Sequence, residues 1–176
     1  HFMHSYDDGL TAIRYPRDVI HEITSDAPPF VLGKAHQLRS SKQPKLAILG
    51  YGAPTIDALD AAERVDSNAI EVYDARFAKP VDGKLIESLL SRSIPIITVE
   101  DHSLIGGFGS AVIEEAVKRK LDTTLITPLG LPDRFIGHGS RAEQLREAGI
   151  DTASIATVAS RVLSSQPNES PAIVTS

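Results

Sequence analysis

Short apolar runs alternate along this chain with stretches of helical periodicity, and this alternation most limits its possible folds. Each run is apolar or rich in β-branched residues and ends at a turn, after which apolar residues recur every three or four positions. The expected strands cover residues 45–49, 69–73, 94–99 and 123–127. The expected helices cover residues 54–65, 82–90, 110–119, 142–148 and 152–163. This order predicts an α/β fold, with a three-layer, mainly parallel sheet and helices on both faces.

The composition is that of a globular domain, and it narrows the range of partners. The 176 residues are 41% hydrophobic and carry a formal net charge of -5 with both signs mixed. Nucleic-acid surfaces need clustered Lys and Arg, so we expect no nucleic-acid partner. No apolar run approaches the roughly 18 to 20 residues of a membrane span, so we expect no membrane association. The chain has no cysteine, which excludes disulfides and thiolate chemistry.

The ends of the chain lack the sustained periodicity of its middle. Leu10 to Tyr15 form a β-favouring run that Pro16 stops. A lone strand cannot satisfy its own hydrogen bonds, so this run is expected to join the main sheet or to belong to another domain. We divide the chain into residues 1–18 with this strand, a linker arm at 19–44, a compact domain at 45–164 and a flexible tail at 165–176. Within the arm, residues 30–32 and 35–38 could pair as a local hairpin.

Charged residues follow the third apolar run, at the edge of the sheet where ligands dock in open α/β folds. Glu100, Asp101 and His102 lie there, and Gly106 and Gly107 lead through a tight turn into the next helix. A carboxylate beside an imidazole can serve in proton transfer. The motif itself contains no nucleophile or metal partner. Three interpretations therefore stay open: an acid–base pair, a solvated strand end, or an interface in an oligomer.

The motif Gly50-Tyr51-Gly52 lies between a strand and a helix, as in dinucleotide-binding sites. Asp74 follows at the distance expected for an acid that binds the ribose. Thr55 replaces the third glycine, however, and Pro54 lacks the N–H that would face a pyrophosphate. The pattern therefore favours a tight strand-to-helix turn over a nucleotide site.

Three arginines could bind an anion. Arg14 and Arg17 lie three residues apart around Pro16, and guanidinium groups bind phosphate or carboxylate oxygens in a bidentate manner. The pattern alone favours surface ion pairs with the neighbouring Asp residues. Arg76 lies two residues after Asp74, and we expect it to form a structural ion pair rather than a ligand contact.

The order of motifs along the chain resembles that of one enzyme family. The motifs are Ile13-Arg14-Tyr15-Pro16-Arg17, Leu32-Gly33-Lys34-Ala35, Leu46-Ala47-Ile48-Leu49-Gly50-Tyr51-Gly52, Asp74-Ala75-Arg76-Phe77-Ala78-Lys79-Pro80, Val99-Glu100-Asp101-His102 with Gly106-Gly107-Phe108-Gly109-Ser110, and Leu129-Gly130-Leu131-Pro132-Asp133-Arg134-Phe135-Ile136 with Gly139. Together they resemble the C-terminal end of the 1-deoxy-D-xylulose-5-phosphate synthases, which are transketolase-like enzymes. The resemblance extends to about Val162 and implies the fold of a transketolase C-terminal domain.

The resemblance implies a reaction that this chain does not carry out alone. Enzymes of the family condense pyruvate with glyceraldehyde 3-phosphate, with loss of CO2, on thiamine diphosphate and Mg²⁺ in the synthesis of isoprenoid, thiamine and pyridoxal precursors. The chain contains neither the family's Gly-Asp-Gly…Asn metal motif nor the glutamate region of its pyrimidine-binding domain. We therefore expect an inactive C-terminal fragment with no catalytic residue, cofactor contact or metal ligand of its own. Its expected partners are the missing N-terminal domains, a second copy in a homodimer and the small-molecule substrates, in a bacterial cytoplasm or a plastid.

The resemblance also implies roles for particular residues. Residues 1–18 would be the last strand of the pyrimidine-binding domain, with Arg17 on the phosphate of the aldehyde substrate and Arg14 in a structural role. Asp18 replaces the usual glycine and adds a negative charge beside that site. The residues expected to support a domain or dimer interface are Glu100, His102, Gly106 and Gly107. The alternative is an independent Rossmann-like domain that binds a nucleotide or serves as an interaction module.

Overall fold

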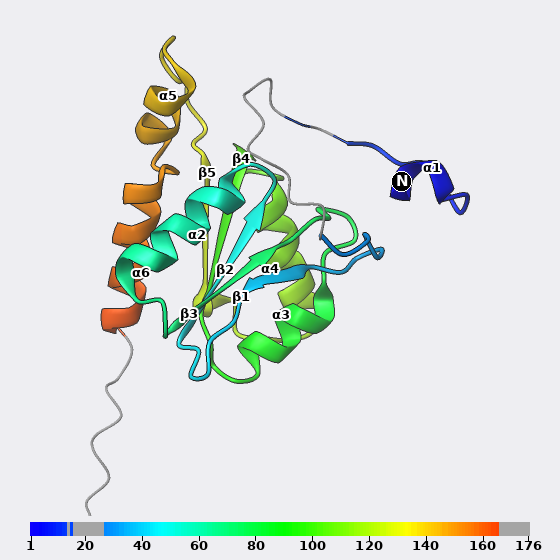
Figure 1. The fold of residues 1–176 in the computed structure, drawn as a ribbon, viewed down its shortest axis with the longest axis horizontal. Helices are drawn as coiled ribbons and strands as arrows, with labels where there is room; N and C mark the ends of the chain where they lie inside the picture. Colours follow the sequence, from blue (N-terminus) through cyan, green and yellow to red (C-terminus); the bar gives the residue numbers. More distant parts are fainter. Residues whose placement is uncertain (14, 16–26, 166–176) are drawn as a thin grey trace, which may run out of the picture.

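The chain builds a five-stranded sheet that is covered by helices on both faces (Figure 1). The computed structural model describes residues 1–13, 15 and 27–165. In chain order its elements are α1 (Phe2–Ser5), β1 (His36–Arg39), β2 (Leu46–Tyr51), α2 (Pro54–Val65), β3 (Ile70–Asp74), α3 (Gly83–Leu90), β4 (Ile96–Ser103), α4 (Phe108–Lys118), a 3₁₀ helix η1 (Thr123–Leu125), β5 (Ile126–Leu131), α5 (Arg141–Ala148) and α6 (Thr152–Ser165). The predicted three-layer α/β class is confirmed.

The strands follow the order β1-β3-β2-β4-β5 across the sheet. Strands β3, β2, β4 and β5 are parallel, whereas β1 runs antiparallel to β3. Strand β2 lies between β3 and β4. The chain therefore connects β2 to β3 on one side and then returns past β2 to form β4 on the other side. In open α/β sheets, this change of direction places a ligand- or partner-binding crevice beyond the carboxyl ends of the central strands.

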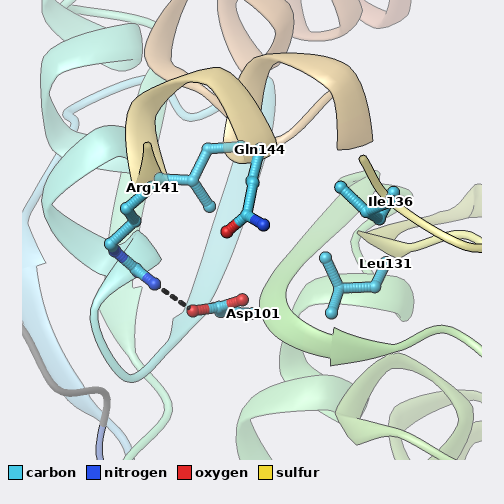
Figure 2. A pocket seen from close by; sticks show the side chains of 6 residues that line it. Asp101, Leu131, Ile136, Arg141 and Gln144 are labelled. Atoms are coloured by element: carbon cyan, nitrogen blue, oxygen red, sulfur yellow. Dashed lines mark hydrogen bonds and ion pairs between the residues drawn. The ribbon is translucent and has the colours of Figure 1, made fainter. Parts of the chain in front are cut away.

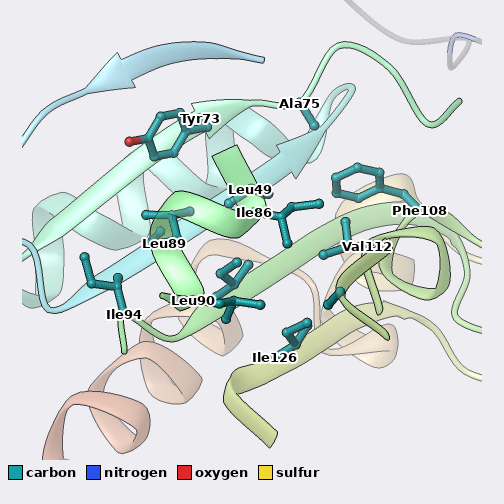
Figure 3. Close-up of a cluster of buried hydrophobic side chains, with 13 residues drawn as sticks. Leu49, Tyr73, Ala75, Ile86, Leu89, Leu90, Ile94, Phe108, Val112 and Ile126 are labelled. Carbon is teal, nitrogen blue, oxygen red and sulfur yellow. The ribbon is translucent and has the colours of Figure 1, made fainter. Parts of the chain in front are cut away.

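The core consists of two apolar clusters, one on each face of the sheet. Successive residues of a strand point to opposite faces, so Leu46 and Ile48 pack against α2 and α6, whereas Ala47 and Leu49 face α3 and α4. Small residues on α2 let α6 approach closely, and Ile155 is fully buried there. The cluster under α3 and α4 is shown in Figure 3 and contains Ala47, Leu49, Tyr73, Ala75, Ile86, Leu89, Leu90, Ile94, Ile96, Phe108, Val112, Ala116 and Ile126.

The helices begin and end close to the predicted positions. Asp82 is the N-cap of α3, as expected, and its carboxylate accepts a hydrogen bond from the Leu85 N–H at 3.2 Å. Helix α4 begins two residues earlier than predicted, at Phe108, because the Glu100 side chain supplies the acceptors for its first turn. None of the helices in the described residues is long and apolar enough to cross a membrane.

The fourth strand differs from the prediction. Residues 123–127 were expected to form it, but Thr123–Leu125 form a 3₁₀ turn and the strand covers Ile126–Leu131. The carboxylate of Asp122 accepts hydrogen bonds from the N–H and the hydroxyl of Thr124 at 2.9 and 2.6 Å. This local capping outweighs the β propensity of two threonines and delays the strand.

The predicted strand at Leu10 to Tyr15 is absent from residues 10–13 and 15. The side chains of Leu10, Ile13 and Tyr15 are exposed, at 105, 68 and 78%. Residues 10–13 and 15 pair with neither edge strand of the sheet, β1 or β5. That the run belongs to a sheet of another domain stays a prediction.

The predicted hairpin between residues 30–32 and 35–38 is also wrong. Val31 to Lys34 form a turn, closed by the Lys34 N–H donating to the Val31 carbonyl at 3.0 Å. His36–Arg39 instead pair with β3, where an unpaired edge would otherwise be exposed. Strand β1 thus lies inside the range interpreted as a linker arm. The domain boundaries stay a prediction, and the tail at 166–176 lies outside the described residues.

Candidate functional site

The carboxyl end of β4 contains a buried charge. Glu100 is 1% exposed, and its two carboxylate oxygens accept hydrogen bonds from the backbone N–H groups of Phe108 and Gly109 at 2.6 and 2.8 Å. These groups open α4, where the unpaired amides and the helix dipole favour a negative charge. Glu100 is therefore an internal helix cap. It is neither a solvated strand end nor a carboxylate available for proton transfer.

The loop between β4 and α4 is shaped around this cap. A Cβ atom at Gly107 would lie 2.3 Å from the Glu100 carboxylate and 2.1 Å from the Ser103 carbonyl oxygen, so only glycine fits. Gly106 has a φ of +71°. Its N–H donates to the Ser110 hydroxyl, which in turn donates to the Leu104 carbonyl at 2.8 Å. The loop is thus held by hydrogen bonds to α4 at its start and end.

His102 lies near the end of β4 and is exposed, so Glu100 and His102 do not form a buried acid–base pair. Ile105 is 70% exposed at the tip of the same loop. The interface role expected for Glu100, His102, Gly106 and Gly107 stays a prediction, because a single chain shows only its own internal contacts.

Beside this loop, a hollow of about 160 Å³ lies between the carboxyl ends of β4 and β5 and helix α5 (Figure 2). Arg141 donates from Nη1 to the Asp101 carboxylate at 2.5 Å across its wall, and Gln144 lies on the same helix as Arg141. The lining residues are Asp101, Leu131, Ile136, Arg141, Gln144 and Leu145. The hollow therefore combines an aliphatic floor with a neutralised pair of charges.

Sequence analysis did not identify Arg141 or Gln144. Helix α5 begins with a capping box, in which the Ser140 hydroxyl accepts the Glu143 N–H and the Glu143 carboxylate accepts the Ser140 N–H. This Ser-x-x-Glu spacing is a signal that could have located the start of the helix. Asp101 and Arg141 lie 40 residues apart, however, so no local pattern could have paired them.

The glycine motif after β2 serves a tight turn. A Cβ atom at Gly50 would lie 2.6 Å from the Cα atom of Thr55, so the glycine lets α2 start directly against the strand. Pro54 has no N–H, and the Thr55 and Ile56 N–H groups donate within the turn to Gly52 and Ala53. The first amides of α2 are thus already paired and do not offer a phosphate site.

Arg17, predicted to bind the substrate phosphate, and Arg14, predicted to have a structural role, lie outside the described residues. Arg76 forms the expected ion pair, with Nε 3.5 Å from an Asp74 carboxylate oxygen. On the same strand, β3, the buried Glu71 accepts from the Tyr73 hydroxyl at 2.9 Å and from Gln37 of β1 at 3.2 Å. Burial and the neighbouring Glu71 carboxylate raise the pKa of Tyr73 well above its ordinary value.

Comparison with known proteins places this arrangement in a family. A sequence profile described as "Transketolase, C-terminal domain" matches residues 33–155. The chain belongs to this family. The 1-deoxy-D-xylulose-5-phosphate synthases of Geobacillus sp. (strain WCH70) and Rhodopirellula baltica are 42% identical over 154 residues and 37% identical over 152 residues. These alignments cover 85 and 86% of the chain but only 24% of each relative, so the chain spans about a quarter of their length.

Solved structures share the fold of this transketolase C-terminal domain. The structure titled "Split gene transketolase, inactive beta4 tetramer" superposes with a TM-score of 0.71 at 27% identity, over 84% of this chain and 48% of that chain. Transketolase from Leishmania mexicana superposes with a TM-score of 0.55 at 16% identity, over 77% of this chain and 19% of that chain. The second likeness shows the fold alone.

The described part of the transketolase C-terminal domain does not fit a metal–diphosphate cofactor. Within residues 1–13, 15 and 27–165, no three His, Asp or Glu side chains lie together as metal ligands would. At the carboxyl edge of the sheet, Glu100 is bonded to the start of α4 and Asp101 to Arg141. The first amides of α2 and α4 are also paired within the chain. A bound diphosphate or Mg²⁺ would need groups from elsewhere.

Proposed function

We propose that the chain is the C-terminal part of a 1-deoxy-D-xylulose-5-phosphate synthase, which condenses pyruvate with glyceraldehyde 3-phosphate with loss of CO2. The observation that carries the proposal is the 42% identity with the Geobacillus synthase over 85% of this chain. The ordered motifs from Arg14 to Gly139 support the same assignment. The whole enzyme would supply precursors of isoprenoids, thiamine and pyridoxal.

In this proposal the chain completes sites that other domains begin. Arg17 would bind the phosphate of the aldehyde substrate, and residues 1–18 would complete the sheet of the pyrimidine-binding domain. The side chains of Leu10 and Ile13 support this, since they are apolar and exposed, at 105 and 68%. The loop around Gly106, with Ile105 exposed at its tip, would contact a neighbouring domain or the second subunit of a homodimer.

Thiamine diphosphate and Mg²⁺ would be bound by the N-terminal domains, and the chain alone would not turn over substrate. The paired state of Glu100 and Asp101 supports this division of roles, because neither carboxylate is available as a metal ligand. The solved relative of split-gene origin is itself titled an inactive β4 tetramer. The independent nucleotide-binding alternative is not favoured, since the first amides of α2 are paired in the turn.

A chimaera tests the proposal. The first three quarters of the Geobacillus synthase would be followed by this chain, and formation of 1-deoxy-D-xylulose 5-phosphate would be assayed. We expect turnover by the chimaera and none by the chain alone. In the chimaera, Arg17→Ala should raise the KM for glyceraldehyde 3-phosphate by on the order of ten- to a hundredfold, the effect of one charge-assisted contact, and leave the KM for pyruvate unchanged.

Arg161→Ala is the matched control, because Arg161 lies exposed on α6 and its substitution removes the same charge. It should leave both KM values unchanged. A well-folded chimaera without turnover would contradict the assignment to this enzyme. Equal effects of Arg17→Ala on both substrates would contradict the phosphate-binding role.

A further inference from the structure

Arg76 adopts a backbone conformation that residues with a Cβ atom rarely adopt. Its φ is +59°, in the left-handed region, immediately beyond the end of β3. The Asp74 carboxylate holds this turn by accepting the Arg76 N–H at 3.1 Å. Such a strained position persists where the surrounding structure fixes it.

The Arg76 side chain is aimed at the arm that leads into the domain. It is only 5% exposed, although arginine is rarely so buried. Nη1 donates to the Pro29 carbonyl at 3.2 Å, and the guanidinium carbon lies 4.6 Å from the centroid of the Phe30 ring. Asp74 neutralises the buried charge, with its carboxylate 3.5 Å from Nε. A planar guanidinium can bond a carbonyl and stack on a ring at once, which lysine cannot do.

We propose that Arg76 is a positioning residue that clamps the arm at Pro29 and Phe30 onto the carboxyl end of β3. The clamp fixes the direction in which the chain preceding Pro29 leaves the domain. Phe77 extends the contact, with its ring centroid 5.9 Å from that of Phe30 in an edge-to-face arrangement. The purpose of the clamp rests on the proposed function: it would fix the point at which the chain that follows Arg17 joins the domain. The clamp itself rests on the contacts of Arg76.

Limited digestion of the 176-residue chain with chymotrypsin tests the clamp. Arg76→Asn keeps a residue that tolerates positive φ but is too short to reach Pro29. We expect cleavage after Phe30 to become about tenfold faster, as follows from losing one charge-assisted hydrogen bond. Cleavage after the exposed Leu10 should not change, and neither should the melting temperature. The rates are measured by mass spectrometry of the fragments.

Lys120→Asn is the matched control, because Lys120 is exposed and has the same φ of +59°. It should leave cleavage after Phe30 at the wild-type rate. If Arg76→Asn does not fold, Arg76→Lys replaces it, with an expected increase of at least about threefold because a single ammonium cannot make both contacts. An unchanged rate after Phe30 would overturn the proposal. So would an equal increase at every site with a lower melting temperature, because Arg76 would then only stabilise the domain.

The two proposals fail separately. The digestion uses the chain alone, so its outcome does not depend on which enzyme the chain belongs to. A digestion result that overturns the clamp would not affect the proposed function tested with the chimaera. An inactive chimaera would not affect the clamp proposal.

Discussion

Glu100 shows at the scale of one residue why a charge in a sequence does not reveal its role. From the sequence alone, the motif Glu100-Asp101-His102 suggests acid–base chemistry. In the structure, Glu100 is buried against two helix amides, Asp101 binds Arg141, and His102 is exposed. Three adjacent residues thus have three different environments. Strand alternation and the position of α4 decide this, and neither can be derived from the motif.

Removing the charge of Glu100 should destabilise the domain. Glu100→Gln keeps the shape of the side chain but turns an acceptor into an NH2 group that faces a backbone N–H. We expect the free energy of unfolding to fall by about 2 to 4 kcal/mol, measured by urea denaturation, because hydrogen bonds to a charged acceptor are lost and one amide is left buried. Glu114→Gln, on the exposed face of α4, is the control and should change stability by less than about 0.5 kcal/mol. Equal effects of the two substitutions would refute the capping role.

Helix α5 relies on polar contacts at both of its ends. None of its residues is fully buried, although Leu145 and Ala148 pack against the apolar cluster under α2 and α6. Its ends are fixed by the capping box at Ser140 and by Gly149, which adopts a left-handed C-cap. Arg141 of α5 forms an ion pair with Asp101 of β4. Arg134, in the loop before α5, forms an ion pair with Glu147 of α5. Sequence analysis predicted this helix at residues 142–148 from its periodicity, but it did not predict the contacts that attach the helix to the domain.

Loss of the cap should therefore loosen α5 without unfolding the domain. Ser140→Ala removes the hydroxyl that accepts the Glu143 N–H and should destabilise the helix locally by about 0.5 to 2 kcal/mol. Hydrogen exchange of residues 141–148 should accelerate, while the melting temperature of the domain stays near that of the wild type. Ser140→Thr keeps a capping hydroxyl and should exchange like the wild type. Unchanged exchange in Ser140→Ala would contradict the capping role of Ser140.

At the scale of the whole molecule, paired carboxylates link stability to pH. Glu115, Asp122, Glu143 and Glu147 each have a pKa below its ordinary value, caused mainly by hydrogen bonds from Arg119, Thr124, Ser140 and Arg134. Groups with a lowered pKa in the folded state stabilise it above their ordinary pKa and lose that effect as the pH falls through the folded-state pKa. Tyr73 has a raised pKa, so its contribution to the stability of the folded state is complete below about pH 10 and is lost as the pH rises further.

The melting temperature should accordingly form a plateau between acid and alkaline limbs. It should fall below about pH 4, where the carboxylates become protonated, and again above about pH 10. Scanning calorimetry across this range at constant ionic strength measures both limbs. Added salt should weaken the acid limb, since the carboxylates concerned lie near the surface. A melting temperature that rises on acidification would contradict the assigned directions of the pKa shifts.

Hydrophobic periodicity and turn residues act locally, so the class of the fold could be predicted from the amino-acid sequence alone. The parallel strands, the N-cap at Asp82 and the tight turn at Gly50 could all be predicted in this way. Tertiary structure decided what depends on distant partners. It paired β1 with β3, left the run from Leu10 to Tyr15 outside the sheet, buried Glu100 and brought Arg76 to Pro29. These outcomes depend on which edges are open and which amides are unpaired, and only the folded chain determines that.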